Sequence, residues 1–484
     1  MKKKNIIGII VLICLLLIGF SFGYYLISKS QESNNIAGSK CFKLELTNQS
    51  KKITLDPMYP ISDEEGMSLT PYTFTLTNTC NIDASYSINL EMLEGTTLDS
   101  KYLDVVLNDS GIKLLTSYNT TNTVITGSTE SRTLTTGSLR AKESKDYTLR
   151  FWMDKDVEDT NSMNKVFKSK IVVSAEATVI YPTLVEKVTE LSSTDTVNFA
   201  SDDPDNNIRY IGANPDNYVY FNCSDYNKQS SDTCEKWRII GLFNNITKSD
   251  GSKENLIKII RDETIGAFSW DYTSAGSYTN DWSTSSLQEL LNNFYYEATK
   301  TTYYNNTTTA SDIDFASIGL KNDLTRNAIE NVIWNLGSSS TYDDVTPKMF
   351  YERERANNVY GSHQTTWTGK IGLMYPSDYG YATSGNTTNS RSECLGIPLY
   401  NWSFENETDC KNNNYLYKST YAQWFLESRA DTAIGVFDVY HDGGVNAYTA
   451  NGIDNVRPSL YLKSNISIID GNGSEESPFQ LKVG

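Results

Sequence analysis

The sequence has only two histidines, His363 and His441, and none of the common catalytic motifs. It contains no HExxH, no GxSxG, no Rossmann fingerprint and no phosphate-binding glycine loop, so the enzyme families that depend on them are not indicated. Asp442 adjoins His441, but neighbours on a tight turn rarely face each other, and a catalytic histidine also needs a nucleophile. The residues therefore predict a protein that is not an enzyme and holds no resident cofactor.

Positive charge is also scarce. The chain has 42 Lys and Arg against 59 Asp and Glu, a net charge of −17. Such a surface repels phosphate backbones and anionic lipid headgroups, so nucleic acid is not expected as a partner. It would attract divalent cations or cationic wall components, although an acidic surface also serves solubility alone.

Cysteine is limited to seven residues, with no CxxC spacing of the kind that zinc sites use. Cys14 lies in an apolar segment. The others form couples that are close in sequence, and short loops close with the smallest loss of entropy. Six cysteines allow fifteen pairings, which the sequence alone leaves open, and the local one is favoured: Cys41 with Cys80, Cys223 with Cys234, and Cys394 with Cys410.

One long apolar segment stands at the start of the chain. Residues 6–27 carry no charge and follow three lysines. A helix of this length would cross a bilayer, with the lysines on the cytoplasmic side and the later domains outside. This pattern predicts a single-pass protein of the cell membrane, exposed on a bacterial cell surface. Ser21-Phe-Gly23 leaves a second outcome open, cleavage after Gly23 and secretion.

Changes in composition divide the rest of the chain. The expected parts are a membrane anchor or signal (1–28), a polar spacer (29–40), a first domain (41–183), a linker (184–204) and a second domain (205–484).

Apolar residues alternate with polar ones through the first domain, and no amphipathic helix is evident. This period of two is typical of half-buried strands. It predicts an all-β sandwich, either jelly-roll or immunoglobulin-like. The runs that carry it are Tyr72 to Leu76, Ala84 to Met92, Tyr147 to Met153 and Phe167 to Ala175.

The same segments carry a resemblance. Asn78-Thr-Cys80, Tyr147-Thr-Leu-Arg-Phe-Trp-Met153 and Asn164-Lys-Val-Phe167 resemble the camelysin/TasA family of exported β-sandwich proteins, some of which form biofilm fibres. The resemblance implies a sandwich fold. It raises a structural alternative, in which this domain assembles into a matrix or fibre.

The second domain mixes strands and helices. Strands are expected at 218–221, 237–243 and 255–260, and a hairpin at 436–448 around an Asp-Gly turn. A capping box at Ser286–Glu289 predicts a helix start. A second helix is expected over 325–336.

This domain also has a resemblance. Cys234-Glu-Lys-Trp-Arg-Ile-Ile-Gly241, Gly372-Leu-Met-Tyr-Pro-Ser-Asp378 and Asn455-Val-Arg-Pro-Ser-Leu-Tyr-Leu462 resemble a bacterial surface domain with a VRPALWL-type terminal strand. That domain is distantly similar to C-type-lectin-like folds and to the formylglycine-generating enzyme. The resemblance implies an α+β, C-type-lectin-like fold and no activity. A cryptic enzyme would need reactive cysteines late in the domain. Cys394 and Cys410 are instead expected to form a structural disulfide that closes a loop.

Aspartates offer a calcium site. Asp202, Asp203 and Asp205 are clustered, and Asp470 begins Asp-Gly-Asn-Gly-Ser. Oxygen ligands at alternating loop positions suit Ca²⁺. The second segment is also what a hairpin turn between Ile468 and Phe479 would contain.

Aromatic residues offer a sugar platform. Trp367, Trp402 and Trp424 lie near polar loops, although Trp237 and Trp424 have strand contexts that predict burial. The favoured function is adhesion, with the second domain recognising a carbohydrate, cell-wall or protein ligand.

Overall fold

The computed structural model divides the chain into two compact units, Met1–Ile180 and Tyr181–Gly484, which are described separately. No helix among the residues it describes is long and apolar enough to cross a membrane. The predicted membrane segment falls outside the described residues as far as residue 26, and Ile27–Ser30 form strand β1. The described residues are 27–30, 42–46, 53–55, 59–79, 83–157, 165–177 and 180–483.

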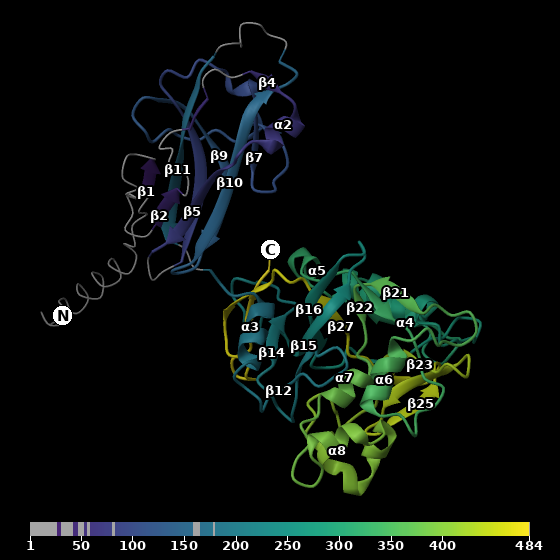
Figure 1. The fold of residues 1–484 in the computed structure, drawn as a ribbon. Coiled ribbons are helices and arrows are strands. Elements are labelled where there is room, and N and C mark those ends of the chain that lie inside the picture. Colours follow the sequence, from purple (N-terminus) through teal and green to yellow (C-terminus); the bar gives the residue numbers. More distant parts are fainter. Residues whose placement is uncertain are drawn as a thin grey trace, which may run out of the picture. The chain divides into compact units, whose positions relative to one another are not determined.

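Two β-sheets make up most of the first unit (Figure 1). One has the strand order β1-β11-β6-β9, with β3 beside β11. The other has the order β2-β5-β10-β7-β8, with β4 beside β10. The strands after β1 are β2 (Phe42–Leu46), β3 (Ile53–Leu55), β4 (Pro60–Ile61), β5 (Tyr72–Asn78), β6 (Ala84–Leu93), β7 (Leu103–Leu107), β8 (Lys113–Leu114), β9 (Ser128–Leu139), β10 (Ser144–Asp154) and β11 (Phe167–Ala177).

Residues from both sheets share one apolar core. Phe74 of β5 stacks on Tyr147 of β10, and Phe151 of β10 meets Phe167 of β11 edge to face. The period-two runs predicted from the sequence are confirmed as strands. Two 3₁₀ turns, η1 (Ser100–Tyr102) and η2 (Leu115–Ser117), flank β7 and β8.

A short helix that the sequence pattern did not predict, α2 (Asp63–Ser68), packs against the face of β10 that points away from the apolar core. Ser62 caps it by accepting a hydrogen bond from the Glu65 amide. Gly66 packs against the ring of Trp152, so closely that a Cβ there would lie 2.2 Å from the ring. The six-residue helix is too short for a helical periodicity to show.

The second unit is also rich in β-structure, with short helices around its sheets (Figure 1). The larger sheet has the order β12-β13-β15-β16-β27-β22, with β14 beside β15, and another has the order β17-β26-β23-β24-β25. The strands are β12 (Phe199–Ala200), β13 (Ile208–Tyr210), β14 (Tyr218–Phe221), β15 (Glu235–Thr247), β16 (Lys253–Arg261), β17 (Ala267–Ser269), β18 (Lys300–Tyr303), β19 (Ser311–Asp314), β20 (Val332–Asn335), β21 (Thr366–Gly369), β22 (Ile371–Gly372), β23 (Gln423–Ser428), β24 (Gly435–Val439), β25 (Val445–Thr449), β26 (Ile453–Asn455), β27 (Ser459–Leu462), β28 (Ser467–Asp470) and β29 (Gln480–Lys482). The helices are α3 (Leu184–Ser192), η4 (Trp282–Thr284), α4 (Ser286–Glu289), η5 (Leu290–Tyr295), α5 (Asp323–Asn327), α6 (Pro347–Glu354), α7 (Pro376–Tyr381), α8 (Arg391–Gly396), η6 (Leu399–Ser403), η7 (Glu405–Glu407) and α9 (Thr408–Asn412).

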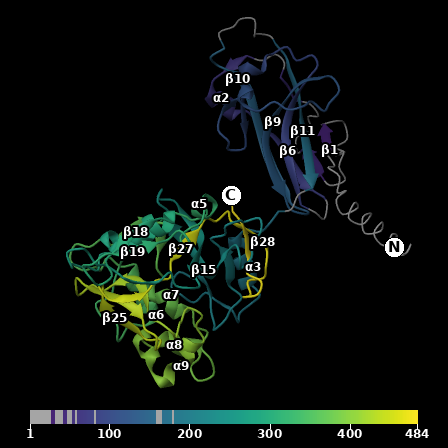
Figure 2. The ribbon, with the colours of Figure 1, turned by 180° about the vertical axis from the view of Figure 1, so that it is seen from behind.

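The segment expected to be a linker, 184–204, belongs to the second unit. Its first half is helix α3, which Thr183 and Glu186 cap reciprocally and which lies beside β28 (Figure 2). Leu184 and Val188 are buried in the core of this unit. The polar residues 192–196 that suggested a linker are the end of this helix and the turn after it, and Asp202 and Asp203 lie in the loop before β13.

Two expected helices differ in detail. The first begins at Ser286, one residue earlier than the predicted capping box implies, because the N-cap is Ser285, which accepts from the Gln288 amide. The second, expected over 325–336, stops at Asn327. Val332–Asn335 instead pair with β21, as their β-branched and aromatic side chains favour.

Other expectations are confirmed. The 218–221, 237–243 and 255–260 segments are strands, and β24 and β25 form the predicted hairpin. Disulfides join Cys223 to Cys234 and Cys394 to Cys410. Cys41, Cys80 and Cys14 lie outside the described residues.

Candidate functional site

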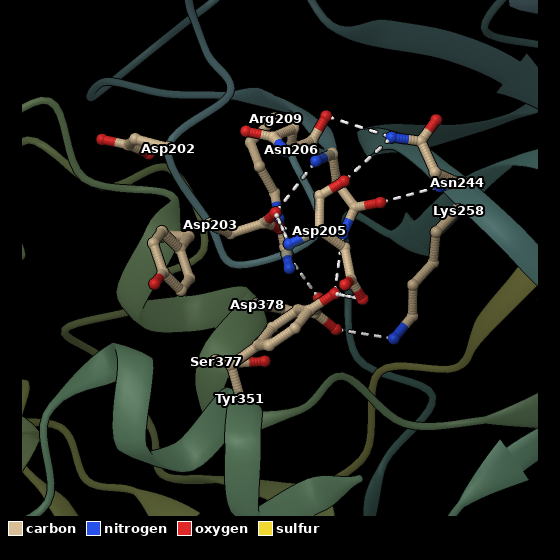
Figure 3. Close-up of polar contacts among 12 residues, drawn as sticks. Asp202, Asp203, Asp205, Asn206, Arg209, Asn244, Lys258, Tyr351, Ser377 and Asp378 are labelled. Atoms are coloured by element: carbon tan, nitrogen blue, oxygen red, sulfur yellow. Dashed lines mark hydrogen bonds and ion pairs between the residues drawn. The ribbon is translucent and has the colours of Figure 1, made fainter.

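The candidate site begins with the loop before β13, where Asp203 organises the backbone. One oxygen of its carboxylate accepts from the amides of Asp205 and Asn207, at 3.2 and 2.9 Å. The other accepts from the side chains of Asn207 and Arg209, at 2.9 and 2.8 Å (Figure 3). This carboxylate is buried, so the loop is held from within.

Arg209, on β13, links this loop to helix α7. Its guanidinium is fully buried and donates to Asp203 and, at 2.7 Å, to Asp378. Lys258, on β16, donates to the second oxygen of Asp378 at 2.6 Å. Two cations thus face two carboxylates in the interior of the protein (Figure 3).

The environment of Asp378 keeps it ionised. Burial alone would raise its pKa, but Lys258, Arg209 and the Tyr375 amide together hold the pKa below its ordinary value. Lys258 lies within cation–π distance of four rings, those of Phe243, Trp334, Tyr375 and Tyr461. The aromatic rings exclude water, and the ion pairs compensate for the lost hydration.

A second buried group lies at the end of α6. Glu354 accepts from the amide and hydroxyl of Ser377, at 2.9 and 2.6 Å, and from Arg355 at 2.9 Å. Burial raises the pKa of Glu354, against the opposing effect of Arg355. Arg355 in turn lies over the ring of Tyr351, with its guanidinium carbon 3.4 Å from the ring centre.

Tyr351 connects this helix to the Asp203 loop. Its hydroxyl donates to Asp205 at 2.6 Å and accepts from the side chain of Asn207 at 2.9 Å. Asn207 also accepts from the Asn244 amide, and the Asn244 side chain donates to the carbonyls of Asp205 and Asn206. The loop, α6 and β15 are therefore fixed to one another.

A pocket of about 190 Å³ lies over this framework. We call it the ionic pocket. Its lining combines amides, one carboxylate and one guanidinium with aromatic rings. The lining residues are Asp205, Asn207, Phe243, Asn244, Asn245, Ile246, Thr247, Ile333, Trp334, Asn335, Tyr351, Arg355, Tyr375 and Tyr461. Small, polar and set on a rigid base, it suits a small ligand with hydrogen-bonding groups.

The aspartates predicted to bind calcium have internal partners. Asp202 pairs with Arg391 and lies apart from Asp203, which holds Arg209, while Asp205 accepts from Tyr351 (Figure 3). Asp470 accepts from the Gly471 amide where the hairpin of β28 and β29 turns. In the described part of the chain, no three His, Cys, Asp or Glu side chains are placed to hold a metal ion.

The tryptophans singled out as a sugar platform are not exposed. Trp402 and Trp424 are buried, and Trp237 is buried as predicted. Trp367 is partly buried, with its ring edge to face against Trp282.

Four buried charged residues of the site were not predicted from the sequence: Arg209, Lys258, Glu354 and Asp378. Lys258 left a readable signal, since it interrupts the apolar run from Leu256 to Ile260. Charged residues within a buried strand are almost always paired, so this lysine predicts a buried carboxylate.

The chain matches no protein-family model and no curated protein sequence. The site must therefore be interpreted from its own chemistry.

Proposed function

We propose that this is a membrane-anchored adhesion protein of a bacterial cell surface, without enzymatic activity. In this proposal, the first unit is a β-sandwich of the camelysin/TasA type. The second is a C-type-lectin-like domain whose ionic pocket binds a small polar group of a glycan, cell-wall or protein ligand.

One observation carries the binding proposal: the ionic pocket is fully built before any ligand arrives. Asp205, Tyr351 and Asn207 are fixed by hydrogen bonds, and Arg355 is held between Glu354 and the ring of Tyr351. Preorganised groups lose little entropy on binding, which favours recognition.

Two lining residues are free to meet a ligand. The side chains of Asn245 and Asn335 form no hydrogen bond to another described residue, although both border the pocket. An amide both donates and accepts, so it recognises hydroxyl and amide groups alike.

A glycan and cell-wall fragment array, probed with the full-length protein in a sugar-free detergent, tests the proposal. Binding to a defined group of fragments is expected. Asn335→Ala should weaken it about tenfold, the effect of one or two hydrogen bonds. The exposed Asn465→Ala is the matched control and should bind as the natural protein does.

Calcium chelation should leave array binding unchanged, because Asp202, Asp203 and Asp205 are bonded to protein groups. A blank array, or equal binding by Asn335→Ala, contradicts the proposal.

The fibre alternative rests on a different feature, strand β9. This strand of 12 residues ends the path of its sheet. Residues 119–121 pair with only part of its free side. An unpaired strand edge can add a strand from another chain. Concentration-dependent, detergent-resistant oligomers would favour this role, whereas a monomer that binds the array would favour adhesion.

A further inference from the structure

A groove of about 270 Å³ lies elsewhere on the second unit and shares no lining residue with the ionic pocket. Helices α4 and η5, strand β18 and the loop after β17 form it. The hairpin of β18 and β19 lies at one edge of this unit (Figure 2). The lining residues are Tyr272, Thr273, Ser274, Ser286, Glu289, Leu290, Phe294, Thr301, Thr302, Tyr303 and Tyr304.

An unusual helix shapes the groove. After one α-helical turn, residues 290–295 form a π-helix, η5. Such segments are rare and are found frequently at functional sites. Glu289 and Phe294 are five residues apart, the spacing of the π-helical hydrogen bond, and both line the groove. The two helical segments therefore contribute a carboxylate and an aromatic ring to the same groove.

Hydrogen bonds fix the floor of the groove. The buried carboxylate of Asp271 accepts from the amides of Ser286 and Thr279, at 2.9 and 2.8 Å. The Ser286 hydroxyl accepts from the Tyr272 amide and lies 3.1 Å from the Tyr303 hydroxyl. Tyr303 donates to the carbonyl of Ser269 at 2.6 Å. The groove thus keeps its shape without a ligand.

The exposed part of the groove has a distinct chemistry. Glu289 is its charged lining residue, is exposed, and forms no ion pair or hydrogen bond through its side chain to another described residue. Thr273, Ser274, Thr301 and Thr302 add hydroxyl groups to the lining. The partly buried rings of Tyr272, Phe294 and Tyr304 supply aromatic surface.

From this combination we infer that the groove is a second binding site, which takes one pyranose ring of a neutral sugar. The C–H face of a pyranose packs against aromatic rings, whose faces are electron-rich. Its hydroxyls donate to the Glu289 carboxylate and exchange hydrogen bonds with the serine and threonine hydroxyls.

An ammonium group is the competing ligand, because cations also bind to aromatic faces beside a carboxylate. The groove offers only one carboxylate but several neutral hydroxyls, which match a polyhydroxylated ring better than a cation. The inference holds whatever ligand the ionic pocket binds.

Saturation-transfer NMR and calorimetry on the full-length protein, again in a sugar-free detergent, test this site with glucose, galactose, mannose and N-acetylglucosamine in turn. At least one should bind. Glu289→Gln, which keeps the side-chain volume, should weaken binding about tenfold through the loss of a charge-assisted hydrogen bond. Glu297→Gln, just beyond the π-helix and also exposed, is the matched control and should bind normally.

Tyr304 separates stacking from hydrogen bonding. Tyr304→Phe should retain most of the affinity, whereas Tyr304→Ala should lose it, with circular dichroism confirming that both variants are folded. Binding of choline or lysine in place of a sugar, no signal from any of the four sugars, or full binding by Glu289→Gln overturns the inference. If none of the four sugars binds while array binding persists and is weakened by Asn335→Ala, the groove inference fails alone and the adhesion proposal stands.

Discussion

Both units bury charged side chains, such as Glu91 and Asp104 in the first, but the second joins several of them in one ionic network. In the first, the sheets enclose a core of aliphatic and aromatic residues such as Phe74, Leu90 and Phe167. In the second, Arg209, Lys258 and Asp378 are as deeply buried as the surrounding aromatic rings. The first core is held by area removed from water, whereas part of the second depends on exact compensation of charge. The second unit should therefore be far more sensitive to isosteric changes of charge.

The largest expected effect comes from breaking the buried network. Asp378→Asn leaves Arg209 with Asp203 as its remaining carboxylate and removes the carboxylate that pairs with Lys258, without changing the volume of the side chain. Loss of one partner from a buried ion network costs about 3–5 kcal/mol of the free energy of unfolding. Seven of the eight tryptophans lie in the second unit, so tryptophan fluorescence during denaturant unfolding reports this change.

Asp202→Asn is the control for that experiment. Asp202 lies in the same loop as Asp203 and pairs with Arg391. The side chain of Asp202 is 44% exposed. Exposed ion pairs contribute about 1 kcal/mol or less. Equal destabilisation by the two variants would show that burial does not distinguish the network from an ordinary surface pair.

The same contrast decides what could be predicted from the sequence. Period-two alternation depends on neighbours in the chain, so the runs around Tyr86 and Leu149 predicted their strands. The buried network depends on contacts between distant residues, since Arg209 and Asp378 are 169 positions apart. Asp203 stood out as a carboxylate in a polar loop, but only the fold shows that its cation is an arginine of the same chain.

The wrongly predicted helix over 325–336 also results from contacts between residues distant in the sequence. Residues 325–336 have apolar spacing that fits a helix, yet β20 forms because Val332–Asn335 find a partner strand in β21. Tertiary pairing overrides local propensity there. The π-helix at 290–295 has no sequence signature, and so the groove beside it could not be predicted.

A smaller effect is expected in the first unit from Gly66→Ala. The new Cβ would lie 2.2 Å from the Trp152 ring, so α2 or the ring must shift. Overpacking of this kind costs about 1–3 kcal/mol. Calorimetry should show a lower unfolding temperature for the first unit, whereas Asp378→Asn should lower that of the second unit. Met67→Ala, on the same helix and 43% exposed, should change stability by about 0.5 kcal/mol or less.

The smallest effect concerns one uncompensated charge in the first unit. Burial, with Asp154 and Asp63 nearby, raises the pKa of Asp104 from 3.8 to about 6. The folded state therefore binds the proton more tightly than the unfolded state, and stability falls as the pH rises from about 4 to 6. Asp104→Asn removes this penalty and should stabilise the first unit by about 1 kcal/mol at pH 7, with no gain at pH 4. Melting temperatures from pH 4 to 7 measure the difference, with the exposed Asp109→Asn as the control. An equal gain at pH 4 would assign the effect to packing of the amide and not to loss of the buried charge.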